Sequence, residues 1–501
     1  MAQVAAELED VLDSGYSVDA PLDITVYFAP LGTTWTENGV THTSNGWTQD
    51  EISAALSALG AWSDVADLNI TQTTDPNGAT FHLGTTGIGS GFYAYFYLPT
   101  GIPGSNFGVF DTNHPSWTQG SIQPGGFSYT ILLHEFGHGL GLEHPHGTSA
   151  FPGVDHAADL GDFDLNQGIY TVMTYNEGWV TSPDGPLPVG LLDYGYSYTP
   201  MALDIAVIQN IYGANTDHQS GHSVYQLPGA NAPGVGYGAI WDTGGIDTII
   251  NTTTLNSVID LRPATLQVEE GGGGWVSSVD AVFGGFTIAA DVVIENATGG
   301  GGDDVLIGNA ANNILSGNAG DDILIDALGS DLLDGGSGDD ILINGTGLST
   351  IYGQGGDDLL LGGSQADVLD GGAGNDALRG DLLGSVMGSS DTLIGGLGDD
   401  VLAGGLGADI FVFGPNEGSD IIGAFATASI TAGDPLPAVV TGSDFVPGLD
   451  TIALSGFGPS VQSNPMSFVT ASGGQSVFLA EGTEITFFGV TGLSNDDFSI
   501  F

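Results

Sequence analysis

Apolar residues follow two different spacings along this chain, and the change comes near residue 215. Before it, Ile52, Leu56 and Leu59 recur at helical spacing behind the capping-box sequence Thr48-Gln49-Asp50-Glu51, which predicts an amphipathic helix. The same criteria predict helices over residues 128–140 and 199–213, the latter with Pro200 at its first position, and strands over residues 22–28, 69–73 and 79–83. Helices and strands mixed within one such stretch indicate an α+β domain.

Beyond residue 215 the helical spacing disappears. From Gly299 a nine-residue unit of the form G-G-x-G-x-D-x-U-x runs to Arg379 and resumes at Gly395. Its eighth position holds a large apolar residue: Leu306, Leu315, Leu324, Leu333, Leu342, Ile351, Leu360, Leu369, Leu378, Leu402 and Phe411. This predicts short strands stacked in a parallel β-roll, because one such strand cannot bury its apolar face alone. A disordered Gly/Asp-rich tract is the alternative, but disorder requires no apolar residue at a fixed place.

The Gly-rich turns of this roll would align carboxylates with glycine carbonyl oxygens, an all-oxygen environment that suits Ca²⁺. Without calcium the carboxylates repel, so we expect this half to fold poorly until it meets the ion. The expected ligands are Gly300, Gly302, Asp304, Gly320, Asp322, Asp331, Gly336, Gly338, Asp340, Gly356, Asp358, Asp367, Gly372, Gly374, Asp376, Gly396, Gly398, Asp400 and Asp409. Asn313 and Ser349 replace the acid at position six, so their turns are expected to bind weakly or not at all.

The charge balance excludes further classes of function. The chain has 60 Asp and Glu against two basic residues, Arg262 and Arg379, and a formal net charge of -58. The acidic content itself is ordinary, so the anomaly is the missing bases. Nucleic-acid binding needs basic patches and is excluded, and attraction to anionic membranes is disfavoured for the same reason. Calcium ligation and adaptation to a salty medium both remain as explanations, and they are compatible.

The chain has no Cys, which suits either a cytosolic protein or a secreted one stabilised by metal instead of disulfides. No apolar run is long enough to span a bilayer. The first ten residues lack the basic and apolar regions of a secretory signal peptide, so either a leader has been removed or export uses another signal.

The segment from His134 to His144 carries the candidate catalytic chemistry. On a helix, His134 and His138 share one face and can both reach one Zn²⁺. Gly141 lets the chain leave the helix sharply and return His144 as third ligand, which leaves the fourth position to water. Glu135 can take the proton of that water and pass it to the leaving amine. Structural histidines are the alternative, but this spacing is very rare by chance, and the other histidines are assigned structural or solvated roles.

Val172-Met173-Thr174-Tyr175 follows downstream. Met173 would give the three imidazoles an apolar surface beneath them, although plain core packing is the alternative. Tyr175 could reach the zinc or stabilise the oxyanion of a tetrahedral intermediate.

The extended zinc motif and this methionine make the sequence resemble the metzincins. With Met173-Thr174-Tyr175 and the C-terminal repeats, it is similar to the serralysins, secreted bacterial RTX metalloproteases of the peptidase M10B type. The resemblance covers nearly the whole chain and includes residues 62–66, 204–215, 241–245, 259–263 and 294–297.

The resemblance implies a multi-domain chain. A leader or short pro-segment would cover residues 1–20, an N-terminal α+β metzincin protease domain residues 21–215, and an all-β parallel β-roll (RTX) domain residues 216–501, with regular repeats over 299–412. It implies one catalytic Zn²⁺ on His134, His138 and His144, Glu135 as base, Tyr175 as a switchable ligand, and several structural Ca²⁺ ions. It also implies an early calcium site at Gly221, Ser223, Asp242, Gly244, Gly245, Asp247 and Glu295, with Gln219 where the family usually has Arg.

The expected function is that of a secreted, extracellular metalloendopeptidase acting on proteins and peptides. Its other implied partners are a type I secretion apparatus, which would read the C-terminal Asp497-Phe498-Ser499-Ile500-Phe501, and a proteinaceous inhibitor. We expect a monomer, no nucleic acid and no membrane insertion.

Three alternatives remain. A calcium-dependent RTX adhesion or surface protein would show the same repeats but need no His-Glu-x-x-His helix. An RTX lipase would need a nucleophilic Ser in a G-x-S-x-G setting, and none is convincingly placed. A dead protease is the third, although every expected residue is present.

Overall fold

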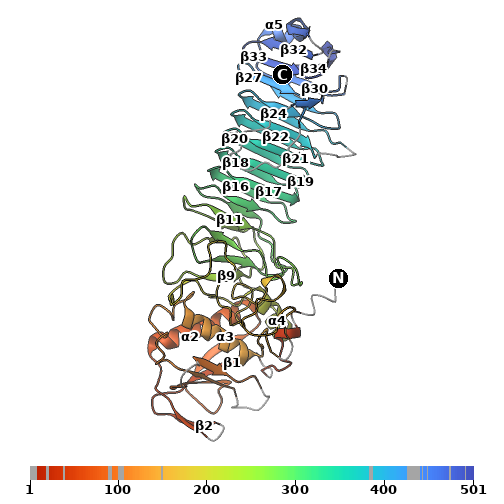
Figure 1. Cartoon of the computed structure of the whole chain (residues 1–501). Coiled ribbons are helices and arrows are strands. Elements are labelled where there is room, and N and C mark those ends of the chain that lie inside the picture. The colour runs from red at the N-terminus through yellow and green to blue at the C-terminus, as the bar shows by residue number, and fades with distance from the viewer. Residues whose placement is uncertain are drawn as a thin grey trace. The chain divides into compact units, whose positions relative to one another are not determined.

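The computed structural model describes residues 8, 10–18, 22–37, 40–88, 93–99, 106–147, 150–382, 388–425, 440–442, 444–447, 449–472, 475–490 and 492–500. The chain packs as two compact units (Figure 1). The first comprises Met1–Ser223, Leu227–Ile246 and Arg262–Val293, and the second Val224–Gln226, Asp247–Leu261 and Ile294–Phe501. Phe501 of the expected secretion signal lies outside the described residues.

The first unit is built around a five-stranded sheet in the order β4-β1-β5-β7-β6. β4, β1, β5 and β7 are parallel, and β6 pairs antiparallel with β7 at the edge. α2 and α3 pack against each other beside this sheet (Figure 1). The elements of this unit are β1 Asp23–Phe28, β2 Thr34–Glu37, β3 Val40–Thr43, α2 Gln49–Val65, β4 Asn69–Thr73, β5 Phe81–Thr85, β6 Ala94–Phe96, β7 Phe107–Phe110, α3 Phe127–Leu140, η1 Asp162–Asp164, α4 Ala202–Tyr212, β9 Tyr237–Ile240, β12 Ser277–Val279 and β13 Gly285–Ile288.

The helix ends follow local chemistry. The predicted capping box of α2 is present, since the Thr48 amide donates to Glu51 Oε2 at 2.7 Å and the Glu51 amide to Thr48 Oγ1 at 3.3 Å. α3 ends where Gly141 adopts φ 111°, a left-handed conformation that glycine takes at little cost.

The prediction that α4 begins at Pro200 is wrong, because α4 begins at Ala202. Met201 is extended, and its amide donates to the Asp204 carboxylate at 2.9 Å. An acidic side chain at the third helical position therefore fixes the start of α4 instead of the proline.

The second unit is a parallel β-roll, as predicted. Successive strands alternate between two sheets, so one turn takes two nine-residue units: Leu315 pairs with Leu333 in one sheet, and Leu324 with Leu342 in the other. Figure 1 shows these strands stacked one above another. One sheet has the order β34-β30-β26-β24-β22-β20-β18-β16-β14-β10-β8, and the other runs β31-β32-β33-β27-β25-β23-β21-β19-β17-β15-β11 within this unit.

The strands and helices of the second unit have the following bounds. They are β8 Val224–Gln226, β10 Thr248–Ile250, β11 Ser257–Asp260, β14 Asn296–Thr298, β15 Val305–Ile307, β16 Ile314–Ala319, β17 Ile323–Leu328, β18 Leu332–Ser337, β19 Ile341–Thr346, β20 Thr350–Gly355, β21 Leu359–Gly363, β22 Val368–Ala373, β23 Ala377–Asp381, β24 Thr392–Leu397, β25 Val401–Ala403, β26 Ile410–Phe413, β27 Gly418–Ile422, β28 Ala424–Phe425, β29 Val440–Gly442, β30 Thr451–Leu454, α5 Pro459–Ser463, η2 Pro465–Phe468, β31 Val469–Ser472, β32 Gln475–Ala480, β33 Thr483–Phe487, η3 Asn495–Asp497 and β34 Phe498–Ile500.

The core of the roll consists of the eighth-position residues, which are fully buried from Leu306 to Phe411. The turns between strands need positive φ. Gly347, at φ 141°, is one example, and a Cβ at this position would overlap the Gly329 carbonyl oxygen of the turn below. No helix in the described part of the chain combines the length and apolarity needed to cross a membrane.

Candidate metal and catalytic site

Three histidines converge in the first unit. His134 and His138 lie on the same face of α3, and the chain leaving that helix at Gly141 returns His144 to them. His144 Nε2 lies 3.1 Å from His134 Nε2 and 3.0 Å from His138 Nε2. Tetrahedral zinc with nitrogen ligands at about 2.0–2.1 Å places those nitrogens about 3.3 Å apart, so the donor set fits Zn²⁺.

Backbone carbonyls fix the tautomers of two of these rings. His134 Nδ1 donates to the Val172 carbonyl oxygen and His138 Nδ1 to the Leu142 carbonyl oxygen, each at 2.7 Å. A carbonyl oxygen can only accept, so both Nδ1 atoms carry the proton and both Nε2 atoms present a lone pair. Two nitrogens that both present lone pairs cannot hydrogen-bond to each other, because neither donates a proton, but both can bind one cation.

Burial keeps these imidazoles neutral. It lowers the pKa of His138 to about 4 and that of His144 to about 3, and it lowers the pKa of His134 well below its ordinary value. Neutral imidazole is the form that binds zinc, so this environment favours binding at neutral pH.

Glu135 follows the first histidine on α3 and is buried. Burial raises its pKa to about 8, while a backbone hydrogen bond from Phe96 opposes the rise. Its Oε2 has no hydrogen-bond partner within the described structure. The carboxyl group is thus positioned to exchange a proton with a reacting molecule.

The loop after α3 brings Met173 and Tyr175 to the histidines. Met173 is buried, and a Cβ on Gly137 would lie 2.5 Å from its sulfur. Tyr175 is 56% exposed, and its ring centroid lies 4.8 Å from that of His144. His146 also stacks on His144, with a centroid separation of 4.8 Å. The phenol ring of Tyr175 therefore borders the His134 and His144 imidazoles as well as solvent.

A cavity of about 360 Å³ opens beside His134 and Glu135. Phe127, Ile131 and Val172 give it apolar walls, and Glu177 contributes a second carboxylate. Burial raises the pKa of Glu177 to about 8. Sequence reasoning missed Glu177, because only the fold brings the loop after Met173 to the start of α3.

The predicted aspartate ligands of the repeats lie between the strands of the roll, whereas Gly336, Gly372 and Gly396 fall near the ends of β18, β22 and β24. Their carboxylates form two columns, in which each aspartate accepts a hydrogen bond from the amide of its counterpart one turn earlier. In one column the Asp322 amide donates to Asp340 Oδ1, and the Asp340 amide to Asp358 Oδ1, both at 2.8 Å. The other column includes the hydrogen bond from the Ser349 amide to Asp367 Oδ1, also 2.8 Å long.

The second oxygen of these carboxylates is buried and has no partner within the described structure. This holds for Oδ2 of Asp322, Asp331, Asp340, Asp358, Asp367, Asp376, Asp400, Asp409 and Asp420. Unpaired buried carboxylate oxygens are costly unless a cation binds them, so this donor set fits Ca²⁺. Elsewhere than at the three histidines, no group of three His, Asp or Glu converges among the described residues, so backbone carbonyls would have to complete each shell.

Several acids of the columns escaped the sequence prediction. Asp391 and Asp420 continue the two columns. Asp391 accepts a hydrogen bond from the Asp367 amide, and Asp420 accepts one from the Asp400 amide. The insertion after Arg379 shifts the spacing of Asp391 from 18 to 24 residues, which takes it out of the nine-residue frame. Asp326 is also buried, at a position where most units have glycine, and this departure was a signal in the sequence.

The residues of the predicted early calcium site are divided between the units. Gly221, Ser223, Asp242, Gly244 and Gly245 belong to the first, while Asp247 and Glu295 belong to the second. Within the first unit the Gly244 amide donates to Asp242 Oδ1 at 2.9 Å, and within the second the Asp247 amide donates to Glu295 Oε2 at 2.8 Å. This site stays a prediction.

Residues 203–486 match the family model described as Peptidase M10 serralysin C terminal. The chain is 35% identical over 271 residues to Metalloprotease AprA of Pseudomonas entomophila (strain L48), covering 52% of this chain and 53% of that protein. It is 33% identical over 284 residues to Serralysin of Photorhabdus laumondii subsp. laumondii, covering 54% and 55%. The chain thus spans about half the length of the curated relatives it matches. The crystal structure of extracellular lipase LipA from Serratia marcescens aligns with 40% of this chain and 39% of its own, at 20% identity and a TM-score of 0.20, a similarity too low to carry an argument.

Proposed function

Because this chain belongs to the serralysin family of M10 peptidases, we propose that it is a secreted zinc-dependent endopeptidase that hydrolyses extracellular proteins. The observation that carries the proposal is the convergence of three imidazole Nε2 atoms beside a buried glutamate that lines a cavity. An adhesion protein would have no use for this arrangement.

His134, His138 and His144 would hold the zinc. When bound, Zn²⁺ supplies a Lewis acid that polarises the scissile carbonyl and makes water more acidic. Glu135 lines the cavity, and its Oε2 has no hydrogen-bond partner within the described structure, so it would accept the proton of the attacking water and deliver it to the leaving nitrogen. Tyr175 would donate its phenolic hydrogen to the oxyanion of the tetrahedral intermediate. The nearby cation would also lower the pKa of Glu135, which favours the carboxylate that a base requires.

The repeats would bind several Ca²⁺ ions. The unpaired Oδ2 atoms of the two aspartate columns support this proposal, because each turn presents another buried negative charge. The protein would fold this roll only after export to a calcium-rich medium. We also propose a type I secretion apparatus and a proteinaceous inhibitor as partners, and residues 1–20, 21–215 and 216–501 as functional domains.

Digestion of casein by the zinc- and calcium-loaded protein tests the proposal. We expect chelation of zinc to abolish cleavage, and Glu135→Gln to lower kcat by about 10²–10⁴-fold. Zinc content must be measured in the variant, so that loss of the base is separated from loss of the metal.

Glu269→Gln is the matched control, because it removes the same charge from an exposed site in the same unit. It should retain wild-type activity. Casein cleavage that survives in Glu135→Gln would refute the role of Glu135, and a wild-type protein that holds zinc but cleaves nothing would refute the function itself.

A further inference from the structure

The cavity beside the histidines has the form of a pocket for one substrate side chain. His134 and Glu135 form part of its lining, so a side chain that fills it belongs to a residue next to the scissile bond. Its volume of about 360 Å³ admits a long side chain. The pocket would therefore select among substrates, a role that rests on the proposed peptidase function.

The walls of the pocket are aromatic and aliphatic. The rings of Tyr93 and Phe127 meet edge to face with centroids 5.1 Å apart, and Ile131 and Val172 complete the apolar surface. Aromatic faces attract cations, and the methylene stem of Lys or Arg packs well on apolar walls while its charged end reaches further.

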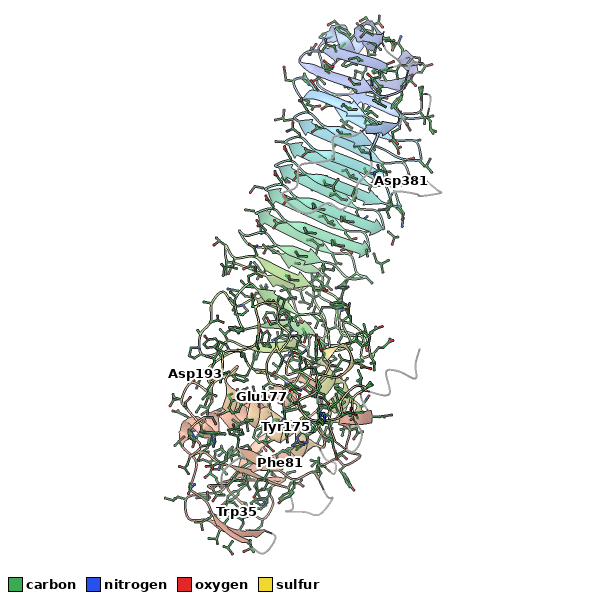
Figure 2. The ribbon with its side chains drawn as sticks, viewed as in Figure 1. Trp35, Phe81, Tyr175, Glu177, Asp193 and Asp381 are labelled. Atoms are coloured by element: carbon green, nitrogen blue, oxygen red, sulfur yellow. The ribbon has the colours of Figure 1, made fainter. Side chains whose placement is uncertain are left out.

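Glu177 lines the same pocket and supplies an acidic partner for that charged end. It is the second acid in the lining, and Figure 2 shows it close to Tyr175. No hydrogen bond or ion pair engages its carboxylate within the described structure, so no side chain of the protein already satisfies it. Its loop is held through the backbone instead, since the Gly168 amide donates to the Asn176 carbonyl oxygen at 2.8 Å.

The net negative charge of the whole protein also favours substrates with basic side chains. With a formal net charge of -58 and two basic residues, the protein attracts cationic segments of a substrate toward any open cleft. Because this field is screened by salt, it assists encounter, whereas a carboxylate inside the pocket acts at short range.

From this geometry we propose that Glu177 is a specificity-determining residue, which makes the pocket select a Lys or Arg side chain adjacent to the scissile bond. The positive charge of a bound ammonium or guanidinium group would lower the raised pKa of Glu177, so the carboxylate would form and pair with it. The Phe127 and Ile131 side chains would hold the stem of the substrate side chain. A purely apolar side chain of similar size would leave a buried carboxylate without a partner, which disfavours it.

The test uses the full-length protein loaded with zinc and calcium and a peptide library derived from a denatured proteome. Mass spectrometry identifies the residues on both sides of every cleaved bond. We expect Lys and Arg to be enriched at one of the two flanking positions. For matched peptides that differ only there, kcat/KM should be at least about tenfold higher with Lys than with Leu.

Glu177→Gln keeps the size of the side chain and should reduce this Lys-to-Leu ratio toward one, while Glu269→Gln should preserve it. The ratio, rather than the rate, is compared, because a loss of folding lowers both rates together. Circular dichroism verifies that each variant is folded.

The wild-type profile alone can overturn the inference. Cleavage without enrichment of basic residues would remove the inference and leave the peptidase function standing. An unchanged Lys-to-Leu ratio in Glu177→Gln would assign the preference to other groups and also overturn the role of Glu177. No cleavage of any peptide by the metal-loaded wild-type protein would overturn the peptidase function as well.

Discussion

The amide of Glu143 donates a 2.7 Å hydrogen bond to the carbonyl oxygen of Leu12, which joins the N-terminal segment to the residue directly before His144. The Ser14 amide donates in turn to the carbonyl oxygen of Gly141, at 3.1 Å. The turn that returns the third histidine is therefore paired on both sides of Leu142 with residues 12–14. This segment supports the turn that carries His144 to the other two histidines.

We predict that Leu12→Ala lowers the free energy of unfolding of the first unit by about 2–5 kcal/mol, because the leucine side chain is fully buried. Its zinc affinity should fall too, since the Gly141–His144 turn loses support. Chelator competition and urea unfolding measure the two effects. Leu31→Ala is the control, because Leu31 is 79% exposed and should change stability by less than about 0.5 kcal/mol. Unchanged stability and zinc affinity in Leu12→Ala would contradict the supporting role.

Gly137 faces Met173 within the site, where a Cβ would lie 2.5 Å from the methionine sulfur. We predict that Gly137→Ala destabilises the first unit by about 1–3 kcal/mol through overpacking and lowers kcat by displacing the loop that holds Tyr175. Thermal unfolding and casein digestion test this. Gly60→Ala on α2 is the matched control, because nothing lies within 4 Å of its Cβ, and it should stabilise slightly. Equal effects of the two substitutions would rule out the contact with Met173.

The roll should become more stable in acid when calcium is absent. Burial raises the pKa of Asp340 and of Asp358 to about 8, from an ordinary value of 3.8. The folded roll thus binds protons that the unfolded chain releases, so its stability rises as pH falls from about 8 toward 3.8. No histidine occurs beyond His222, so no imidazole opposes the trend in this unit. Hydrogen exchange of residues 314–403 in the presence of a calcium chelator, corrected for intrinsic rates, measures it. Weaker protection at pH 6 than at pH 8 would refute the prediction.

Asp340→Asn should have opposite effects with and without calcium. The amide oxygen can still accept from the Asp322 amide, and a buried negative charge disappears, so the calcium-free roll gains stability. The calcium concentration needed for folding should nevertheless rise about tenfold or more, because a charged ligand is lost. A calcium titration monitored by circular dichroism measures the stability of the calcium-free roll and the calcium concentration needed for folding.

Asp339→Asn is the control for this variant. Asp339 is exposed, and its Oδ1 accepts from the Asp357 amide at 2.8 Å in a similar ladder. Its substitution should change little in either the stability of the calcium-free roll or the calcium concentration needed for folding. Equal behaviour of the two variants would exclude the buried column as the calcium-binding element.

The sequence was most informative where spacing alone defines geometry. A period of nine with an apolar eighth residue can bury its strands only by stacking, so Leu306 to Phe411 could be assigned to the core. Histidines four apart share a face of a helix, and Gly141 after them permits the sharp exit that can bring His144 back to that face.

Features that depend on tertiary contacts could not be predicted in this way. The start of α4 is fixed by Asp204, which also accepts hydrogen bonds from the Val172 amide and the Thr171 hydroxyl. Glu177 lines the cavity because separate segments of the chain meet there. Asp391 continues its column although extra residues interrupt the nine-residue frame before it. None of these relationships has a fixed separation along the chain.

The scarcity of basic residues, two arginines in all, bears on whether one molecule of this protein can cleave another. Arg379 is buried in the roll, and the guanidinium carbon of Arg262 lies 3.8 Å from the centre of the Trp275 ring. A peptidase that selects Lys or Arg would find only these two residues in another molecule of the same sequence. Even copies whose roll has not yet met calcium would offer few bonds to cleave, so the scarcity of bases would act as protection against self-digestion.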